Sequence, residues 1–290
     1  MRPERRSNRS IGESKVSRAV LVACALLVLG WLLILPLVLL FAEAFASGVA
    51  AYAAAVTEPD ALAAVRLTLL VAAIVVPLNT AFGLAAAWSI TRFRFPGRRV
   101  LTTLVALPFS VSPVISGMVY VLLFGAQGWF GAWVSATGFK VVFALPGIVL
   151  ATVFVTLPFV AGQLIPLMDA QGVSEEEAAL TLGASGWQMF LRVTLPKVRW
   201  GLLYGVLLCS ARSMGEFGAV SVVSGRIRGL TNTVPLHIEI LYNEYQIAAA
   251  FGCATLLAGV ALLTIALRAG LEWRQDRMRA RGSQAQLVTA

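Results

Sequence analysis

Six long, largely apolar runs constrain this chain more than any other feature of its sequence. They cover residues 19–41, 62–88, 100–124, 145–168, 200–223 and 247–267. About 20 apolar residues are enough for a helix to cross the hydrocarbon core of a bilayer. Inside that core a segment has to be helical, because a helix satisfies its own backbone hydrogen bonds. The predicted fold class is therefore all-α, a polytopic membrane protein with six transmembrane helices.

Composition supports the same class, because 59% of the residues are hydrophobic and 13% are charged. Soluble domains are usually about 25% charged. The predicted transmembrane domain is 19–267, between basic tails at 1–18 and 268–290. A cleaved signal peptide is the alternative for the first run, since Ala44-Phe45-Ala46 resembles a cleavage site. A signal core has roughly 7–15 apolar residues, so the longer run here favours an uncleaved span.

The basic residues predict the topology. Eighteen of the 23 lysines and arginines lie in four segments: residues 1–18, 91–99, 169–199 and 268–290. The predicted outer connections hold only Lys140, Arg226 and Arg228. This is the positive-inside pattern, which places both termini and the loop 169–199 in the cytoplasm. The net charge of +9 is thus explained without nucleic acid as a partner.

The loop at 169–199 is the only long polar interruption in the second half, and its first part predicts a short helix. Ser174 followed by Glu177 has the spacing of a capping box, so a helix is expected to start at Glu175. Three consecutive glutamates then lie in the first turn, where the helix dipole favours negative charge. Gly183 is the expected stop and Gly186 a second weak point.

The second part of this loop predicts another short helix, with Trp187, Phe190 and Leu191 on one face. Pro196 is expected to end the unit. A helix, a break and a second helix with an aromatic face are suited to docking in a groove of a partner protein. A surface loop that packs on its own bundle is the alternative, and both stay open on these grounds.

Arg212 and Glu216 lie near the middle of the fifth run, four residues apart, so one face of a helix is expected to carry both. Charged residues at bilayer depth usually face a bundle interior or a wet cavity. The pair is therefore a candidate for the translocation path, with Arg212 available to an anion. A mutually neutralising pair that fixes packing is the alternative.

Other polar features are less specific. Arg226 and Arg228 are candidates for an outer mouth that favours anions, or else ordinary charges balanced by Glu239 and Glu244. Asn79, in the second run, predicts an interhelical hydrogen bond rather than a ligand contact. Prolines interrupt the third and fourth runs and either line a cavity or shape the bundle. His237, the only histidine, and the three scattered cysteines predict no metal site.

The loop also carries a motif. Glu177, Ala178, Ala179, Gly183, Val193, Leu195 and Pro196 fall at the spacing of the EAA loop of ABC importer permeases. The chain resembles that family, in which the loop is the coupling helix that docks on a cytoplasmic ATPase. The resemblance implies a MetI-like helical fold. It also implies that the coupling residues are Glu177, Ala178, Ala179, Gly183, Trp187, Phe190, Leu195 and Pro196.

A narrower resemblance covers roughly residues 15–270. The run MGEFGAVSVVSGRIRGLTNTVPLHIEILYNEY, with the coupling segment, is similar to the W-type membrane subunit of bacterial sulfate/thiosulfate importers. It implies a T-type permease partner, two ATP-binding cassette subunits and a periplasmic sulfate/thiosulfate-binding protein. It also implies a place in the bacterial cytoplasmic membrane. A molybdate or tungstate importer remains the alternative, because these oxyanions share charge and shape.

No phosphate loop, nucleophile elbow or zinc-protease motif is present in the sequence. The chain is therefore expected to have no catalytic, cofactor or metal site of its own, with ATP and Mg²⁺ bound by the partner ATPase. A membrane enzyme would need ionisable residues in several spans, and only Arg212 and Glu216 qualify. A passive anion channel is the remaining alternative of a different class, and it would need no ATPase dock.

Overall fold

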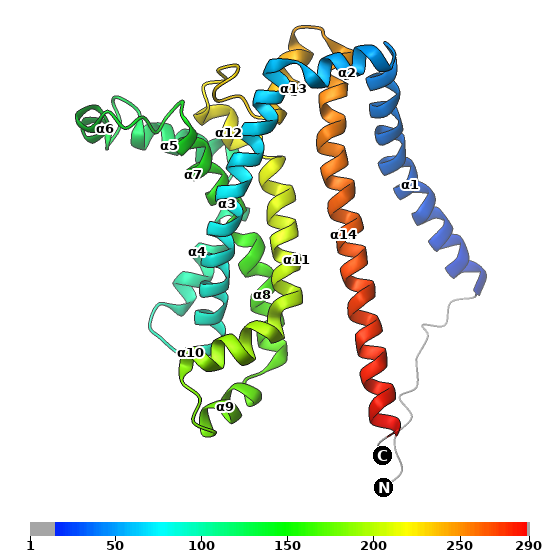
Figure 1. Cartoon of the computed structure of the whole chain (residues 1–290), viewed down its shortest axis with the longest axis vertical. Coiled ribbons are helices and arrows are strands. Elements are labelled where there is room, and N and C mark those ends of the chain that lie inside the picture. The colour runs from blue at the N-terminus through cyan, green and yellow to red at the C-terminus, as the bar shows by residue number, and fades with distance from the viewer. Residues whose placement is uncertain (1–14, 289–290) are drawn as a thin grey trace.

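The computed structural model describes residues 15–288, and those residues form helices joined by short connections, without a β-strand among them. The predicted all-α class is confirmed. The helices stand roughly side by side, with the short α9 and α10 at one end of the molecule and α2 and α13 at the other (Figure 1). These ends are called here the α9 end and the α13 end.

The first half contains α1 (Lys15–Phe45), α2 (Val49–Thr57), α3 (Pro59–Arg92), α4 (Arg98–Ser110), α5 (Pro113–Phe124) and α6 (Gly131–Thr137). The second half contains α7 (Leu145–Thr156), α8 (Pro158–Gln171), α9 (Ser174–Thr181), α10 (Gly186–Met189), a π-helix (Phe190–Thr194), α11 (Leu195–Met214), α12 (Gly218–Val223), α13 (Val234–Asn243) and α14 (Ile247–Val288).

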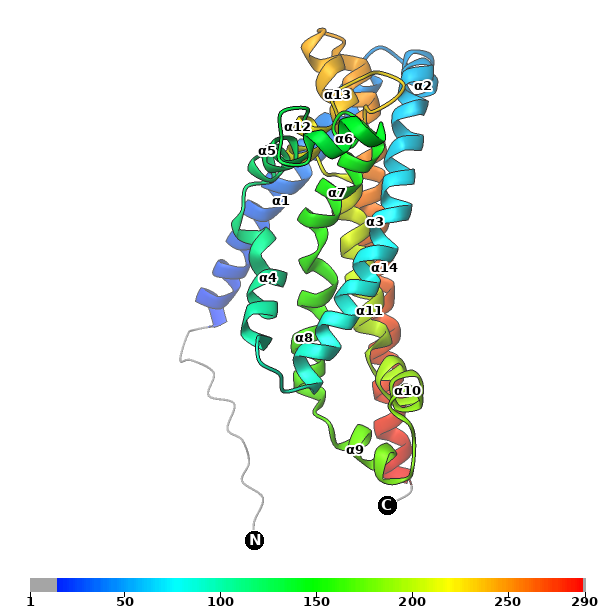
Figure 2. The same ribbon diagram turned by 90° about the vertical axis from the view of Figure 1, so that its left-hand side faces the viewer.

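The centre of the bundle is made by α3, α7, α8 and α11, which pack on one another (Figure 2). One buried cluster joins α3 to α7 and α12 through Val71, Val75, Ile148 and Val220. A second cluster, nearer the α9 end, joins α3, α8 and α11. In contrast, α1 contacts only α2 and α14 among the larger contacts, and none of the residues in its most apolar window is buried in the isolated chain. Lipid or another subunit has to cover that surface.

Four of the predicted spans correspond to long apolar helical segments, at α1, α3, α7–α8 and the first half of α14. The third predicted span is broken within its proline-containing run, and α4 and α5 meet there at an angle of 108°. Pro113 is the first residue of α5 and has no N–H to continue α4, which explains the break. The side of the membrane on which each connection lies stays a prediction.

The fifth predicted span, 200–223, is also interrupted, because α11 ends at Met214 and a separate α12 begins at Gly218. Three connections expected as loops contain the short helices α2, α6 and α13. Runs of hydropathy detect only long segments, so these helices leave no clear signal. The C-terminal tail is not separate either, since α14 continues to Val288. Residues 1–14 of the N-terminal tail lie outside the described residues.

Asn79 on α3 closes a gap that a proline opens in the neighbouring helix. Pro158 breaks the helix between α7 and α8, and Leu157 N donates to Phe154 O instead of to Val153 O. Asn79 Nδ2 donates to the freed Val153 O at 3.2 Å and to Thr156 Oγ1 at 2.7 Å. The predicted interhelical hydrogen bond is confirmed, and it stabilises a break that has to lie inside the bundle.

Small residues set the distance between the central helices. A Cβ atom added at Gly83 on α3 would lie 2.7 Å from Val160 Cβ on α8. Across the same valine, a Cβ at Gly205 on α11 would lie 3.1 Å from Val160 Cα. Val160 is fully buried, so α3 and α11 clamp α8 at this level.

We predict that Gly83→Ala lowers the stability of the protein by about 1–3 kcal/mol, the usual cost of overpacking a core. Gly162→Ala is the matched control, because a Cβ at that position on α8 meets no atom within 4 Å. Thermal unfolding in detergent measures both. Equal unfolding temperatures for the two variants would show that this close approach does not hold the bundle together.

Candidate functional site

The connection between α8 and α11 is the candidate site, and it folds as the sequence predicts at its first break. The helix α9 ends at Thr181, and Gly183 adopts the left-handed region with φ +87°. Gly183 N donates to Leu180 O, and Ala184 N donates to Ala179 O, so the last carbonyls of α9 are satisfied. Glycine adopts this conformation without steric cost, and Gly183 is therefore the stop that was predicted.

The capping box predicted at Ser174 and Glu177 is wrong. The helix α9 already includes Ser174, Val173 precedes it, and no side chain caps this end. The capping box forms at the next helix instead. Gln188 N donates to Ser185 Oγ at 3.3 Å, and Ser185 N donates to Gln188 Oε1 at 2.9 Å. The glutamates of α9 are thereby left for other contacts or for solvent.

Pro196 does not end the unit, which corrects the second boundary prediction. The chain stays helical from α10 through the π-helix Phe190–Thr194 into α11, with Pro196 in the first turn of α11. Leu195 N donates to Phe190 O, five residues back. Pro196 has no N–H and its ring displaces the carbonyl of the preceding turn, which favours this wider turn. The loop is thus continuous with α11 and is not hinged at the proline.

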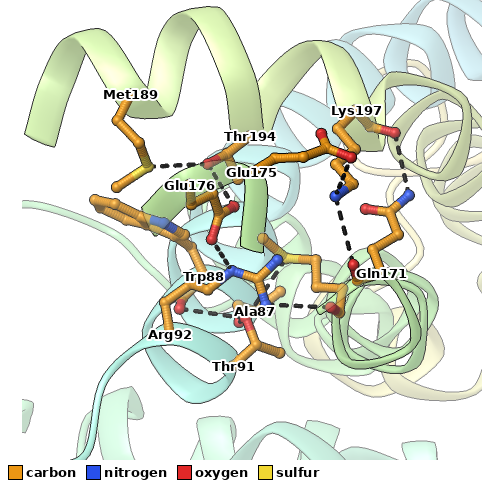
Figure 3. A network of polar contacts seen from close by, with 11 residues as sticks. Ala87, Trp88, Thr91, Arg92, Gln171, Glu175, Glu176, Met189, Thr194 and Lys197 are labelled. Atoms are coloured by element: carbon orange, nitrogen blue, oxygen red, sulfur yellow. Dashed lines mark hydrogen bonds and ion pairs between the residues drawn. The ribbon is translucent and has the colours of Figure 1, made fainter. Parts of the chain in front are cut away.

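A buried ion pair fixes α9 to the end of α3 (Figure 3). Arg92 Nε lies 2.5 Å from Glu176 Oε2, and both side chains are 6% exposed. Thr194 Oγ1, at the end of the π-helix, donates to Glu176 Oε1 at 2.7 Å. Arg92 Nη1 donates to Met168 O of α8 at 3.1 Å. The Arg92–Glu176 pair therefore joins α3, α8, α9 and the π-helix before α11 in a single network.

A second set of contacts closes the base of the loop, where α8 ends and α11 begins (Figure 3). Gln171 Nε2 donates to Lys197 O at 3.3 Å, and Lys197 Nζ donates to Gln171 O at 3.4 Å. Lys197 Nζ also lies 3.1 Å from Glu175 Oε1. Because Glu175 is largely exposed, its ion pair with Lys197 contributes little to stability. The two side-chain-to-backbone hydrogen bonds between Gln171 and Lys197 therefore determine the geometry of the base.

Of the two aromatic residues predicted for the second helix, Phe190 is buried and Trp187 is exposed. Phe190 is 8% exposed and lies between Trp88 of α3, at 4.7 Å between ring centroids, and Trp187, at 5.6 Å. Trp187 and Leu191 are 66% and 42% exposed. The prediction that all three share one outward face is wrong for Phe190, which belongs to the core.

An exposed surface remains on the loop after these contacts are made. Its large apolar members are Leu180, Leu182, Trp187 and Leu191, and the motif residues Glu177, Ala178 and Gly183 of the same connection are exposed too. Leu182 is 88% exposed. These residues are here called the loop face, and nothing in the described chain covers them. Several large apolar side chains left exposed on one connection favour a protein–protein contact.

Arg92, Glu176 and Thr194 were not among the residues predicted from the sequence. Three glutamates occur in a row, and no local rule distinguishes Glu176, which turns inward, from Glu177, which is exposed. The signal that was available is Arg92 at the end of an apolar run. An arginine there, opposite an acidic helix start, suits such a pair, but the pairing itself depends on tertiary packing.

Arg212 and Glu216 form an ion pair, as the alternative of a mutually neutralising pair expects, with Arg212 Nη2 2.8 Å from Glu216 Oε2. They do not share a helix face, however, because α11 ends at Met214 and Glu216 lies in the connection to α12. Gly215 ends the helix between them. Glu216 Oε1 accepts a hydrogen bond from Ala219 N at 3.0 Å. The pair thus joins the end of α11 to the start of α12.

Arg226 and Arg228, the candidates for an outer mouth, both pair with the residues named in the alternative. Arg226 Nη1 lies 3.2 Å from Glu239 Oε2, and Arg228 Nη2 pairs with Glu244 Oε1. The carboxylate of Glu244, as the principal cause, raises the pKa of Arg228. Because each arginine pairs with a carboxylate, the connection between α12 and α13 carries little unbalanced positive charge.

Comparisons with known proteins place these features in a family context. The family model described as "binding-protein-dependent transport system inner membrane component" matches residues 79–277. The sulfate transport system permease protein CysW of Escherichia coli (strain K12) is 48% identical over 264 residues, 91% of each chain. CysW of Synechocystis sp. is 50% identical over 90% of this chain and 95% of that protein.

Two further similarities are more distant. The sulfate transport system permease protein CysT of Escherichia coli (strain K12) is 37% identical over 81% of this chain and 84% of that protein. A solved bacterial alginate ABC transporter, in complex with an alginate pentasaccharide-bound periplasmic protein, contains a chain with a TM-score of 0.73. That similarity covers 89% of this chain and 96% of the other at 18% identity, so it establishes the fold alone.

We predict that Glu176→Gln destabilises the protein by about 3–5 kcal/mol, because it leaves Arg92 charged and buried without its partner. Glu177→Gln, the same change at the exposed neighbour, is expected to stay within about 0.5 kcal/mol of the unaltered protein. Unfolding in detergent and the rate of proteolysis in the loop measure the two effects. A Glu176→Gln variant as stable and protease-resistant as Glu177→Gln contradicts the anchoring role.

Proposed function

Because the chain belongs to the family of binding-protein-dependent transport system inner membrane components, we propose that it is the permease subunit of an ATP-driven importer of sulfate or thiosulfate. The observation that carries the choice of substrate is its 48–50% identity, over about nine-tenths of its length, to proteins named sulfate transport system permeases. It is a multi-pass protein of the inner membrane and is not itself the enzyme of the complex.

The proposed role of the loop face is to bind a cytoplasmic ATPase subunit. Its exposed apolar residues, above all Leu182 and Trp187, offer contacts that the chain itself does not use. The network around Glu176 supports this role, because a force applied to the loop reaches α3, α8 and α11 together. Packed elements of this kind transmit rigid-body movements between sites.

The proposed partners follow from the same relatives. Similarity to both a CysW and a CysT protein supports pairing with a related T-type permease subunit. Two ATP-binding cassette subunits would bind ATP and Mg²⁺, and a periplasmic protein would deliver sulfate or thiosulfate. Hydrolysis would move the loop, and rocking of the paired permeases would alternate access to the path. Both termini of this chain are then cytoplasmic, as the charge distribution predicts.

Transport by the complete complex in proteoliposomes tests this proposal. We expect ATP-dependent uptake of labelled sulfate in the presence of the cognate binding protein, reduced by unlabelled thiosulfate. Excess molybdate is expected to compete poorly. Uptake of molybdate in preference to sulfate would assign the chain to the alternative substrate, and uptake without ATP would indicate a channel.

A further inference from the structure

The break between α11 and α12 lies close to a second break, the one between α4 and α5. α12 packs against α5, whose junction with α4 is bent by 108°. The contact is close, since a Cβ at Gly117 on α5 would lie 2.6 Å from Ala219 O on α12. A Cβ at Gly218 would lie 3.1 Å from Pro113 Cβ. These four helix ends, here called the elbow, lie below the level of α2 and α13 (Figure 1).

The two charges at the elbow are unequally exposed. The Glu216 side chain is 1% exposed, and its two oxygens are held by Arg212 and by Ala219 N. The Arg212 side chain is 35% exposed, and the structure gives it a contact through Nη2 alone. The other N–H groups of its guanidinium have no hydrogen-bond partner among residues 15–288. Arg212 lies in the last turn of α11, where the helix dipole also favours a cation.

We propose that Arg212 binds the oxyanion as it passes the elbow and that Glu216 holds the guanidinium between passages. This inference rests on the proposed function and names the group of this subunit that handles its anion. A guanidinium presents a planar fork of donors that fits the oxygens of a tetrahedral oxyanion. Discontinuous helices are also the usual place for such sites in transporters.

Glu216 makes the binding reversible. A divalent oxyanion competes with the Glu216 carboxylate for one guanidinium, and the carboxylate regains Arg212 when the anion leaves. Because Glu216 also accepts from Ala219 N, it keeps one contact with α12 during the exchange. Passage of the anion therefore loosens the link between α11 and α12 next to the contact with α5, without leaving the carboxylate wholly unpaired.

A purely structural ion pair makes a different prediction. A buried pair that serves only packing is replaced by apolar residues of similar size with little loss, whereas removal of one partner is harmful. The double variant Arg212→Met/Glu216→Met therefore separates the two roles. If the pair is purely structural, the double variant regains the sulfate uptake that Arg212→Met loses. If Arg212 binds the anion, the double variant does not regain it.

The test uses the complete complex with its cognate binding protein in proteoliposomes, and measures uptake of labelled sulfate together with retention of the ATPase subunits. We expect uptake to fall more than 10-fold in Arg212→Met and in the double variant, while the ATPase subunits stay bound. Uptake by the double variant within about two-fold of the unaltered complex overturns the inference. An unaltered complex that moves neither sulfate nor thiosulfate overturns the proposed function itself.

Arg212→Lys decides the matter if a methionine variant does not assemble. Lysine keeps the charge and the ion pair but loses the planar fork of donors. We expect this variant to assemble and to transport sulfate with a maximal rate lowered about 10-fold. An assembled Arg212→Lys complex with an unchanged maximal rate contradicts direct binding by Arg212.

Discussion

The buried contact between Arg92 and Glu176 is the constraint on which the arrangement of this protein depends. It takes two charges out of water at the α9 end, and additional hydrogen bonds help to offset that cost. Thr194 and the carbonyl of Met168 supply two such bonds, while Arg92 Nη2 has no hydrogen-bond partner among the described residues. Since the four residues come from α3, α8, α9 and the π-helix, satisfying one carboxylate fixes the position of the whole loop. Glu177, Leu182 and Trp187 are exposed as a consequence.

From that network a continuous helical path leads to the elbow. The π-helix passes directly into α11, which carries Arg212 in its last turn, and the partner of Arg212, Glu216, lies in the connection to α12. Along this path α11 and α3 clamp Val160 of α8 between two glycines. Close packing of this kind deforms little. The π-helix and α11 thus connect the loop to the elbow without a break in the helix.

Much of this architecture is predictable from the sequence, for physical reasons that also explain the failures. The long helices follow from apolar runs, and the end of α9 follows from Gly183, which adopts a left-handed conformation. Local rules fail where the outcome depends on distant residues. Ser174 has the spacing of a capping box, but the capping box forms at Ser185. Glu176, and not its neighbouring glutamates, turns inward because it pairs with Arg92. Glu216 lies outside the helix that carries Arg212, because α11 ends before Gly215. The chain then turns into α12, which packs against α5.

Cross-linking from Leu182 tests the central claim, that the anchored loop carries an ATPase on its exposed face. A thiol introduced by Leu182→Cys is expected to cross-link to the ATPase subunit in the assembled complex, above the background of the unaltered protein. Trp129→Cys, which is equally exposed but lies in the connection between α5 and α6, is expected to give no such product. If the thiol at position 182 forms no cross-link and is labelled from outside intact cells by a membrane-impermeant reagent, the account is contradicted.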